Sequence, residues 1–165
     1  MQRHELIDLL KTLKLSGMVS TFDETLTQGI RRQLTTQEIL GQLCQAEVVE
    51  RKARSIRYQI GAARFPIPKD LDSFKFADSP VNEPLIRDLY SGHFLGQARN
   101  LILIGGTGTG KTHLSIAIAS HCIKLGHRGR FFSVIDLVNR LELEKEQGKS
   151  GTLASRLARV EFVVA

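Results

Sequence analysis

The chain has 165 residues, 42% of them hydrophobic and 24% charged, with a formal net charge of +6. This profile is typical of a soluble globular protein and, at this length, of one domain or of one domain plus part of another. No apolar run reaches the roughly 18 residues that span a bilayer, and the segment after Met1 is amphipathic, unlike a signal peptide. We therefore predict a cytoplasmic protein without a membrane partner, with Cys44 and Cys122 reduced and in the core.

The basic excess is moderate in both parts of the chain. Residues 1–80 hold 12 basic and 10 acidic side chains, so +2, and residues 81–165 hold 11 and 7, so +4. Such an excess permits nucleic-acid binding without demonstrating it.

The first 65 residues predict a helical N-terminal region. Leucines at i, i+3, i+4 and i+7 predict one helix face over 2–15, and a shorter helical pattern covers 18–28. The capping-box spacing of Thr35 and Glu38 then opens a long helix over 36–63, which ends before Pro66. Residues 66–80 hold three of the four prolines and are predicted to be a linker. In it, Phe74 and Phe76 either pack in the core or lie near a bound adenine.

Residues 81–165 predict an α/β domain with a parallel sheet. Short apolar runs predict three strands, at 100–104, 129–134 and 160–165, and helical patterns cover 82–90, 111–125, 136–147 and 153–159. The βαβαβ order is typical of an α/β domain with a parallel sheet, and the phosphate-binding loop described next makes it the first part of a P-loop ATPase core. The predicted fold class is therefore α/β, a helical N-terminal region followed by an incomplete P-loop domain.

A phosphate-binding loop carries the strongest functional signal. Gly105-x4-Gly110-Lys111-Thr112 fits the Walker A pattern at every fixed position, after a predicted strand and at the start of a predicted helix. Glycines let backbone N–H groups form an anion nest, to which the helix dipole adds. The whole loop is predicted to bind ATP, and it comprises Gly105, Gly106, Thr107, Gly108, Thr109, Gly110, Lys111 and Thr112.

Two residues of this loop carry the predicted chemistry. Lys111 would reach the β- and γ-phosphates, and the Thr112 hydroxyl would bind Mg²⁺. His113, the next residue, is expected to pack or to cap. The other histidines have no partners at metal-ligand spacing, so no zinc site is expected.

A basic stretch on the long predicted helix is a candidate DNA contact. The run from 51 to 64 has no acidic residue, and its candidate contacts are Arg51, Lys52, Arg54 and Arg57. Arg54 and Arg57 are three residues apart, so both could follow one phosphate backbone. The alternative is a solvated helix face on which Glu47 and Glu50 pair with neighbouring bases.

Three segments resemble the IstB-like ATP-binding proteins, helpers encoded beside insertion-sequence transposases. They are the loop with its flanks, Arg99–Leu114; the stretch Ile60–Pro66 followed by Leu71–Phe74; and Leu13–Met18. The resemblance spans the whole chain, and the family is similar to bacterial helicase loaders among the AAA+ ATPases. It implies ATP binding and hydrolysis, homo-oligomers on double-stranded DNA and a transposase partner. It also favours the DNA role of the basic stretch.

The sequence departs from the family pattern at its end. The resemblance implies a Walker B acidic pair, a sensor and an arginine finger after the third strand, but the chain stops at Ala165. We therefore expect a truncated member that holds nucleotide and hydrolyses it poorly, with Asp136 as the one candidate substitute base. Without a neighbouring strand, the runs 100–104 and 160–165 are expected to expose unpaired edges. The alternatives are a helicase loader, and a remnant that binds nucleotide or DNA without turnover.

Overall fold

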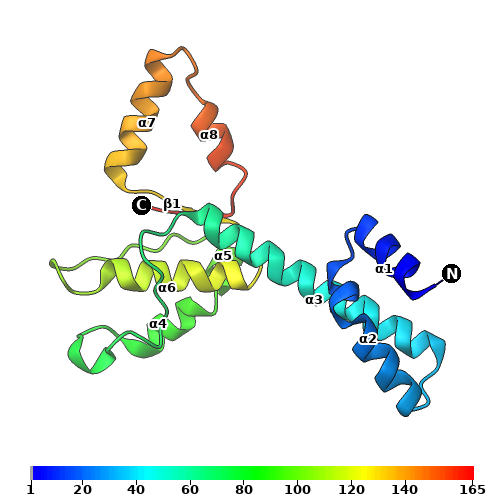
Figure 1. Cartoon of the computed structure of the whole chain (residues 1–165). Coiled ribbons are helices and arrows are strands. Elements are labelled where there is room, and N and C mark those ends of the chain that lie inside the picture. Colours follow the sequence, from blue (N-terminus) through cyan, green and yellow to red (C-terminus); the bar gives the residue numbers. More distant parts are fainter. Residues whose placement is uncertain (1) are drawn as a thin grey trace. The chain divides into compact units, whose positions relative to one another are not determined.

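The computed structural model describes residues 2–165, which form helices and one small parallel sheet (Figure 1). It confirms the predicted mixed α/β class. The chain divides into two compact units, Met1–Arg57 and Tyr58–Ala165, and the division falls inside the long helix. None of the helices in the described part of the chain is both long enough and apolar enough to cross a membrane.

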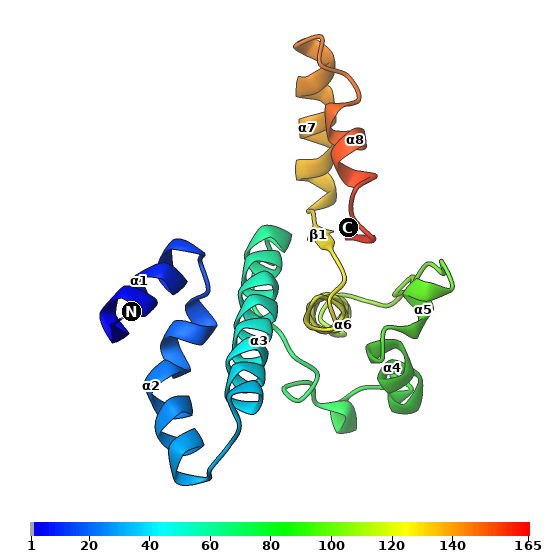
Figure 2. The same cartoon turned by 90° about the vertical axis from the view of Figure 1, so that its right-hand side faces the viewer.

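The first unit is built from α1 (Arg3–Thr12), α2 (Ser16–Arg31) and the first part of α3 (Thr36–Ala63). Figure 2 shows these three helices, and Phe22 and Leu43 are the buried apolar residues of the unit. Gly17 permits the close approach of α2 to α3, because a Cβ there would lie 2.6 Å from the carbonyl oxygen of Ala46. The capping box opens α3 as predicted: the Glu38 carboxylate accepts from the Thr35 backbone N–H at 2.7 Å.

The second unit has its core around α6 (Lys111–Lys124), half of whose residues are buried. The buried residues of α6 are Leu114, Ile116, Ala117, Ile118, Ala119, Cys122 and Ile123. Leu71 and Ile86 pack with Leu114, and Phe74 and Phe76 pack against this cluster. The segment predicted as a linker therefore supplies side chains to the core of this unit.

Short helices connect that segment to the phosphate loop. They are η1 (Phe76–Asp78), α4 (Glu83–Tyr90) and α5 (His93–Gly96). The Asn82 side chain caps α4 by accepting from the Leu85 N–H at 3.0 Å. Helix α4 lies against α6.

The sheet consists of β1 (Gly129–Phe131) and β2 (Phe162–Val164), paired in parallel with Gly129 opposite Phe162. The crossover between them holds α7 (Val134–Glu146) and α8 (Thr152–Leu157). Gly129 is required by close packing, because a Cβ there would lie 2.1 Å from the Phe162 ring.

The prediction of a strand at 100–104, the first of the three expected, is wrong for the described residues. The sheet has two strands, and residues 100–104 pair with neither. Ile102 and Ile104 are 78% and 93% exposed. An apolar run favours a buried strand, but a ladder also needs a partner whose backbone lies alongside. The expected exposure of an unpaired apolar edge is seen here.

Candidate functional site

The phosphate loop lies between residues 100–104 and the N-terminus of α6. Gly108 and Gly110 have φ of +76° and +87°, backbone conformations that favour glycine. The Thr109 hydroxyl donates to the Gly106 carbonyl at 2.9 Å, which closes the turn of the loop. Because Gly110 is the N-cap residue of the fourteen-residue α6, the positive end of that helix faces the loop.

Lys111 folds back over the loop. Its Nζ donates to the carbonyl oxygens of Gly105 and Gly106 at 2.8 and 2.5 Å. The ammonium therefore lies on the loop itself, where it would meet an anion bound by the loop's N–H groups. Thr112, one residue on, is exposed at the first turn of α6. This arrangement fits a nucleoside triphosphate: Lys111 could contact its phosphates, and the Thr112 hydroxyl could bind a magnesium ion.

A groove of about 710 Å³ begins at Lys111 and Thr112. One wall is formed by the exposed face of residues 98–103, and another by residues 161–165. Of the side chains that line it, Glu161 alone carries a carboxylate in the described chain. That carboxylate accepts from His127 Nδ1 at 2.5 Å and lies 3.8 Å from Arg128. The hydrogen bond with His127 lowers the pKa of Glu161, so Glu161 is an ion-pair partner.

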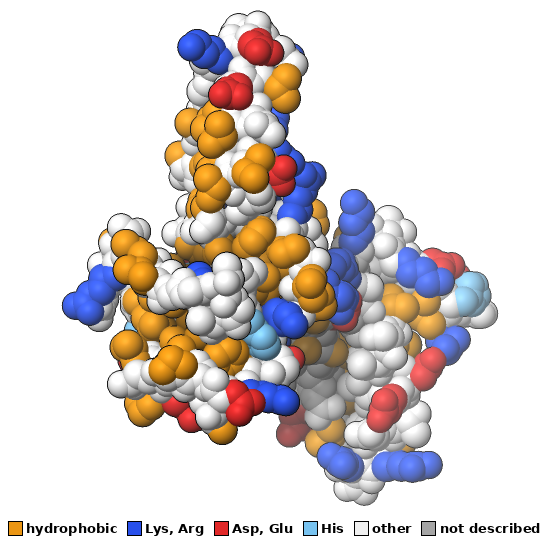
Figure 3. Space-filling model, turned by 90° about the vertical axis from the view of Figure 1, so that its left-hand side faces the viewer, with side chains coloured by type: hydrophobic (Ala, Val, Ile, Leu, Met, Phe, Trp, Pro, Cys, Tyr) orange, Lys and Arg blue, Asp and Glu red, His pale blue; other side chains and the backbone are white. Residues whose placement is uncertain are grey.

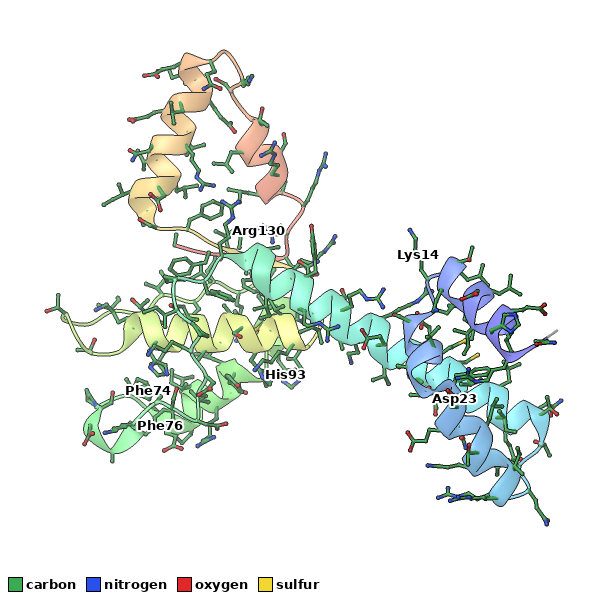
Figure 4. All side chains as sticks on the ribbon, viewed as in Figure 1. Lys14, Asp23, Phe74, Phe76, His93 and Arg130 are labelled. Carbon is green, nitrogen blue, oxygen red and sulfur yellow. The ribbon has the colours of Figure 1, made fainter. Side chains whose placement is uncertain are left out.

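Phe74 packs against the phosphate loop. A Cβ on Gly110 would lie 2.5 Å from the Phe74 ring, so ring and loop backbone are in direct contact. The ring also stands edge-on to His113, with 5.3 Å between the ring centres. It stands edge-on to Phe76 at 4.9 Å, and both phenylalanines are labelled in Figure 4. Packing is thus what the structure shows for both phenylalanines. The sequence pattern alone did not reveal the contact with Gly110, since 36 residues separate the two positions.

His113 ties the same segment to α6. Its Nε2 lies 2.8 Å from the Asp70 carbonyl oxygen and 3.3 Å from the Ser73 hydroxyl. Ser73 in turn donates to the Asp70 carboxylate through its N–H at 2.8 Å, and its hydrogen bonds lower the pKa of Asp70. These contacts give His113 the packing role expected from its place on the helix.

The basic stretch on α3 is largely ion-paired. Arg51 donates to Glu47 at 2.7 Å, and Arg57 donates to Glu50 at 3.0 Å. Arg54 lies 3.8 Å from the Glu50 carboxylate and also donates to Ser16. Only Lys52 of the four candidates has no ion pair in the described part of the chain. Local pairing with Glu47 and Glu50, the alternative left open by the sequence, is therefore what the structure shows.

A second cavity, of about 690 Å³, lies within the second unit and is lined by arginines. Its walls come from residues 58–66, from β1 and the residues around it, and from α7 and α8. Six arginines line it: Arg64, Arg128, Arg130, Arg140, Arg156 and Arg159. Asp136, the candidate substitute base, lies here, whereas Lys111 and Thr112 line the other groove. The sequence did not signal this cluster, because its members are spread over almost 100 residues.

The two cysteines differ. Cys122 is buried in α6, as predicted, and burial raises the pKa of its thiol to about 11. The prediction that Cys44 is a core residue is wrong, because Cys44 is exposed on α3. Apolar residues are spread around α3, so the sequence did not show that Cys44 lies on its exposed face. No group of three or more metal-ligating side chains forms a metal site among the residues the structure describes.

A Walker A loop at the start of a buried helix, beside a parallel strand pair, defines a P-loop nucleotide-binding protein. Comparison with known sequences names the family. The profile of the IstB-like ATP binding protein matches residues 8–165. The chain belongs to this family, as its resemblance predicted.

Individual relatives agree. An ATP-binding protein named for insertion sequence IS5376 of Geobacillus stearothermophilus is 38% identical over 83% of this chain and 55% of its own length. The one named for IS21 of Pseudomonas aeruginosa is 31% identical over 88% of this chain and 56% of its own length. One named for IS232 of Bacillus thuringiensis subsp. berliner is 31% identical over 90% of this chain and 58% of its own length. The chain thus spans about half the length of these relatives.

Proposed function

We propose that this chain binds Mg-ATP and acts as the ATP-binding helper of a transposase on DNA. The observation that carries the proposal is the complete phosphate loop, with Lys111 bound to loop carbonyls and Thr112 at the first turn of α6. Glycine backbone at Gly108 and Gly110 leaves room for the phosphates to approach the main chain.

Within this site each group has one task. The loop N–H groups and the α6 dipole hold the phosphates, and Lys111 adds a full positive charge against the β- and γ-phosphates. The Thr112 hydroxyl is a hard oxygen ligand of the kind that Mg²⁺ prefers. Magnesium supplies charge neutralisation of the triphosphate when it is bound. Lys111 and Thr112 are thus the two proposed catalytic-site residues of this chain.

Replacement of Lys111 by alanine tests the nucleotide site. A charge-assisted contact is worth about 1.5–3 kcal/mol, so we expect ATP affinity to fall roughly 10- to 100-fold. Isothermal titration with Mg-ATP measures it. Lys124→Ala, which removes the same charge from the exposed far end of the same helix, is the matched control. Equal affinities for the two variants would contradict the proposal.

The partners are proposed from the names of the relatives, which are proteins of insertion sequences. A transposase, double-stranded DNA and further copies of the chain are the proposed partners. Co-expression with the transposase encoded in the same insertion sequence, followed by pull-down on duplex DNA, tests all three. Co-elution with a replicative helicase in place of a transposase would show a helicase loader.

We further propose that residues 1–165 hydrolyse ATP slowly when purified alone. Glu161, the one carboxylate side chain in the groove, is held by His127 and Arg128, and Asp136 lies in the other cavity. A general base accounts for about 10²–10⁴ in rate, so its loss leaves turnover near background. Steady-state phosphate release, with Lys111→Ala as the blank, measures it. Turnover that depends on Lys111 but disappears in Asp136→Asn would assign the base to Asp136.

A further inference from the structure

We propose that the arginine-lined cavity of the second unit binds the phosphodiester backbone of DNA. The inference rests on the proposed action on DNA and locates that contact. It assigns the contact to the second unit instead of to the basic stretch Arg51–Arg57 of α3 in the first unit, where the sequence pattern alone had suggested it. The cavity is formed by residues 58–66, the β1 segment and the α7–α8 crossover.

Most of the positive charge of this cavity has no ion-pair partner among the described residues. Six arginine side chains line it, together with one carboxylate, Asp136. Five of these arginines, Arg64, Arg130, Arg140, Arg156 and Arg159, form no ion pair with any residue from 2 to 165; the sixth, Arg128, lies 3.8 Å from Glu161. Guanidinium groups gathered without counter-ions repel one another, and the energy of that repulsion is released when an anion enters.

The basic stretch of α3 differs in this respect. Arg51, Arg54 and Arg57 each lie within 4 Å of a carboxylate on the same helix. A phosphate that binds there competes with Glu47 and Glu50 for these guanidinium groups. Glu47 is only 4% exposed and also accepts from backbone N–H groups of α2, so displacement would cost helix packing as well. The cavity arginines carry no such cost.

Two features favour a polymeric phosphate chain over a single nucleotide. The arginines come from separate segments, at 64, 128–130, 140 and 156–159, so they present donors around the cavity instead of at one point. The guanidinium fork also matches phosphate oxygens bidentately.

Aromatic side chains lie among these arginines. The Arg140 guanidinium lies 5.8 Å from the centre of the Phe132 ring, and Tyr58, 70% exposed, lines the same cavity. A cation held on an aromatic face keeps its outer donors available. Figure 3 shows Lys and Arg side chains along one edge of the arm formed by α7 and α8, and hydrophobic side chains on the face beside it.

The cavity lies next to the nucleotide groove. Phe131 of β1 lines both. A strand of three residues therefore separates the proposed DNA contact from the groove that begins at Lys111.

The test compares two double variants with the same change of charge. Arg140→Gln/Arg156→Gln removes two cavity arginines, and Lys145→Gln/Lys149→Gln removes two cations of the same α7–α8 crossover that do not line the cavity. Anisotropy titrations of labelled duplex DNA at several salt concentrations, without nucleotide, give the affinity and its salt dependence. Because nucleotide is absent, a failure of ATP binding and a failure of this DNA site give separate results.

We expect the arginine variant to lose about 1.8 from the slope of log K against log salt, 0.9 for each lost phosphate contact in B-DNA, and about tenfold or more in affinity. The lysine variant should keep a slope close to that of the wild type. Circular dichroism and Mg-ATP titration confirm that both variants are folded.

Three results would overturn the proposal. Equal slopes for the arginine and lysine variants would show a general charge effect. A larger loss in Arg51→Gln/Arg57→Gln than in the cavity variant would place the contact on the basic stretch of α3. Unchanged DNA binding by the cavity variant, together with lost binding of a polyglutamate peptide, would assign the cavity to an acidic protein segment.

Discussion

At the scale of single residues, Gly110 connects the phosphate loop to the rest of the second unit. Its φ of +87° and the Phe74 ring against its α-carbon both exclude a larger residue. The motif requires glycine here for the phosphates, and the contact with Phe74 adds a second reason. A loop residue thus depends on a side chain 36 positions earlier.

Two variants separate the effect of the positive φ of Gly110 from the effect of its contact with Phe74. Gly110→Ala places a Cβ in a left-handed conformation, which costs about 1–2 kcal/mol, and drives it into Phe74. We expect ATP affinity and thermal stability both to fall. In Gly110→Ala/Phe74→Ala the clash is removed and the strain of φ remains, so part of the affinity lost in the single variant should return. Titration calorimetry and thermal melts measure both quantities.

The matching control is Phe74→Ala by itself, which removes core packing and leaves the glycine in place. If Gly110→Ala binds ATP no better after Phe74 is removed, the contact between ring and loop has no influence on the site, and only the backbone conformation matters.

At the scale of elements, Glu47 joins two helices. Its carboxylate, on α3, accepts from the Gly17 N–H of α2 at 2.7 Å and from Arg51 on its own helix at 2.7 Å. It thereby satisfies a donor at the first turn of α2 that has no partner within that helix. The hydrogen bond from Arg51, with those from the Gly17 and Met18 amides, lowers the pKa of Glu47 against the opposing effect of burial.

The pH dependence follows from this shift. A carboxyl whose pKa is lowered on folding stabilises the fold above its unfolded pKa of about 4.3, and the contribution disappears as the pH falls through the lower folded value. We expect Glu47→Gln to reduce the urea midpoint at pH 7 by more than Arg51→Gln, which leaves the amide contacts in place. Once the pH has fallen below the folded pKa, wild type and Glu47→Gln should converge. A constant difference between them across the whole acid titration would contradict the assignment.

The helices were the predictable elements. Amphipathic periodicity, the Thr35–Glu38 capping box and proline at 66 gave the bounds of α3 within a residue or two, because these signals are local. Strand pairing is not local. The apolar run 100–104 has the composition of a strand, yet in the described chain it lacks a pairing partner, and Ile104 remains 93% exposed. Composition predicts the secondary structure that a segment prefers, whereas backbone pairing in a sheet depends on which strand lies beside it.

At the scale of the whole molecule, the same contrast holds for the sites. The phosphate loop is contiguous, so the sequence alone predicted its place at the start of a helix. The arginine cavity draws on segments from 58 to 160, and only the fold brings them together. The basic run on α3 had the stronger sequence signal, but counter-ions one helical turn away compensate it. A count of basic residues along the sequence does not show which of them are ion-paired, and the structure does.

The division into two compact units predicts how ATP stabilises the molecule. Ligand that binds only the folded second unit stabilises it by RT ln(1 + [L]/Kd), about 2.7 kcal/mol at 100 times Kd. Amides of α6 that exchange by opening of this unit should then exchange up to about 100-fold more slowly. Those of α1 and α2 lie in the other unit, which has its own buried residues, so their exchange should not change. Hydrogen exchange of the intact chain by mass spectrometry, with and without Mg-ATP, measures both sets in one experiment. Lys111→Ala should remove the protection of α6 at the same ATP concentration, which ties it to the loop. Equal slowing in α1, α2 and α6 would mean that the two units open together, and that the long helix α3 transmits binding from one unit to the other.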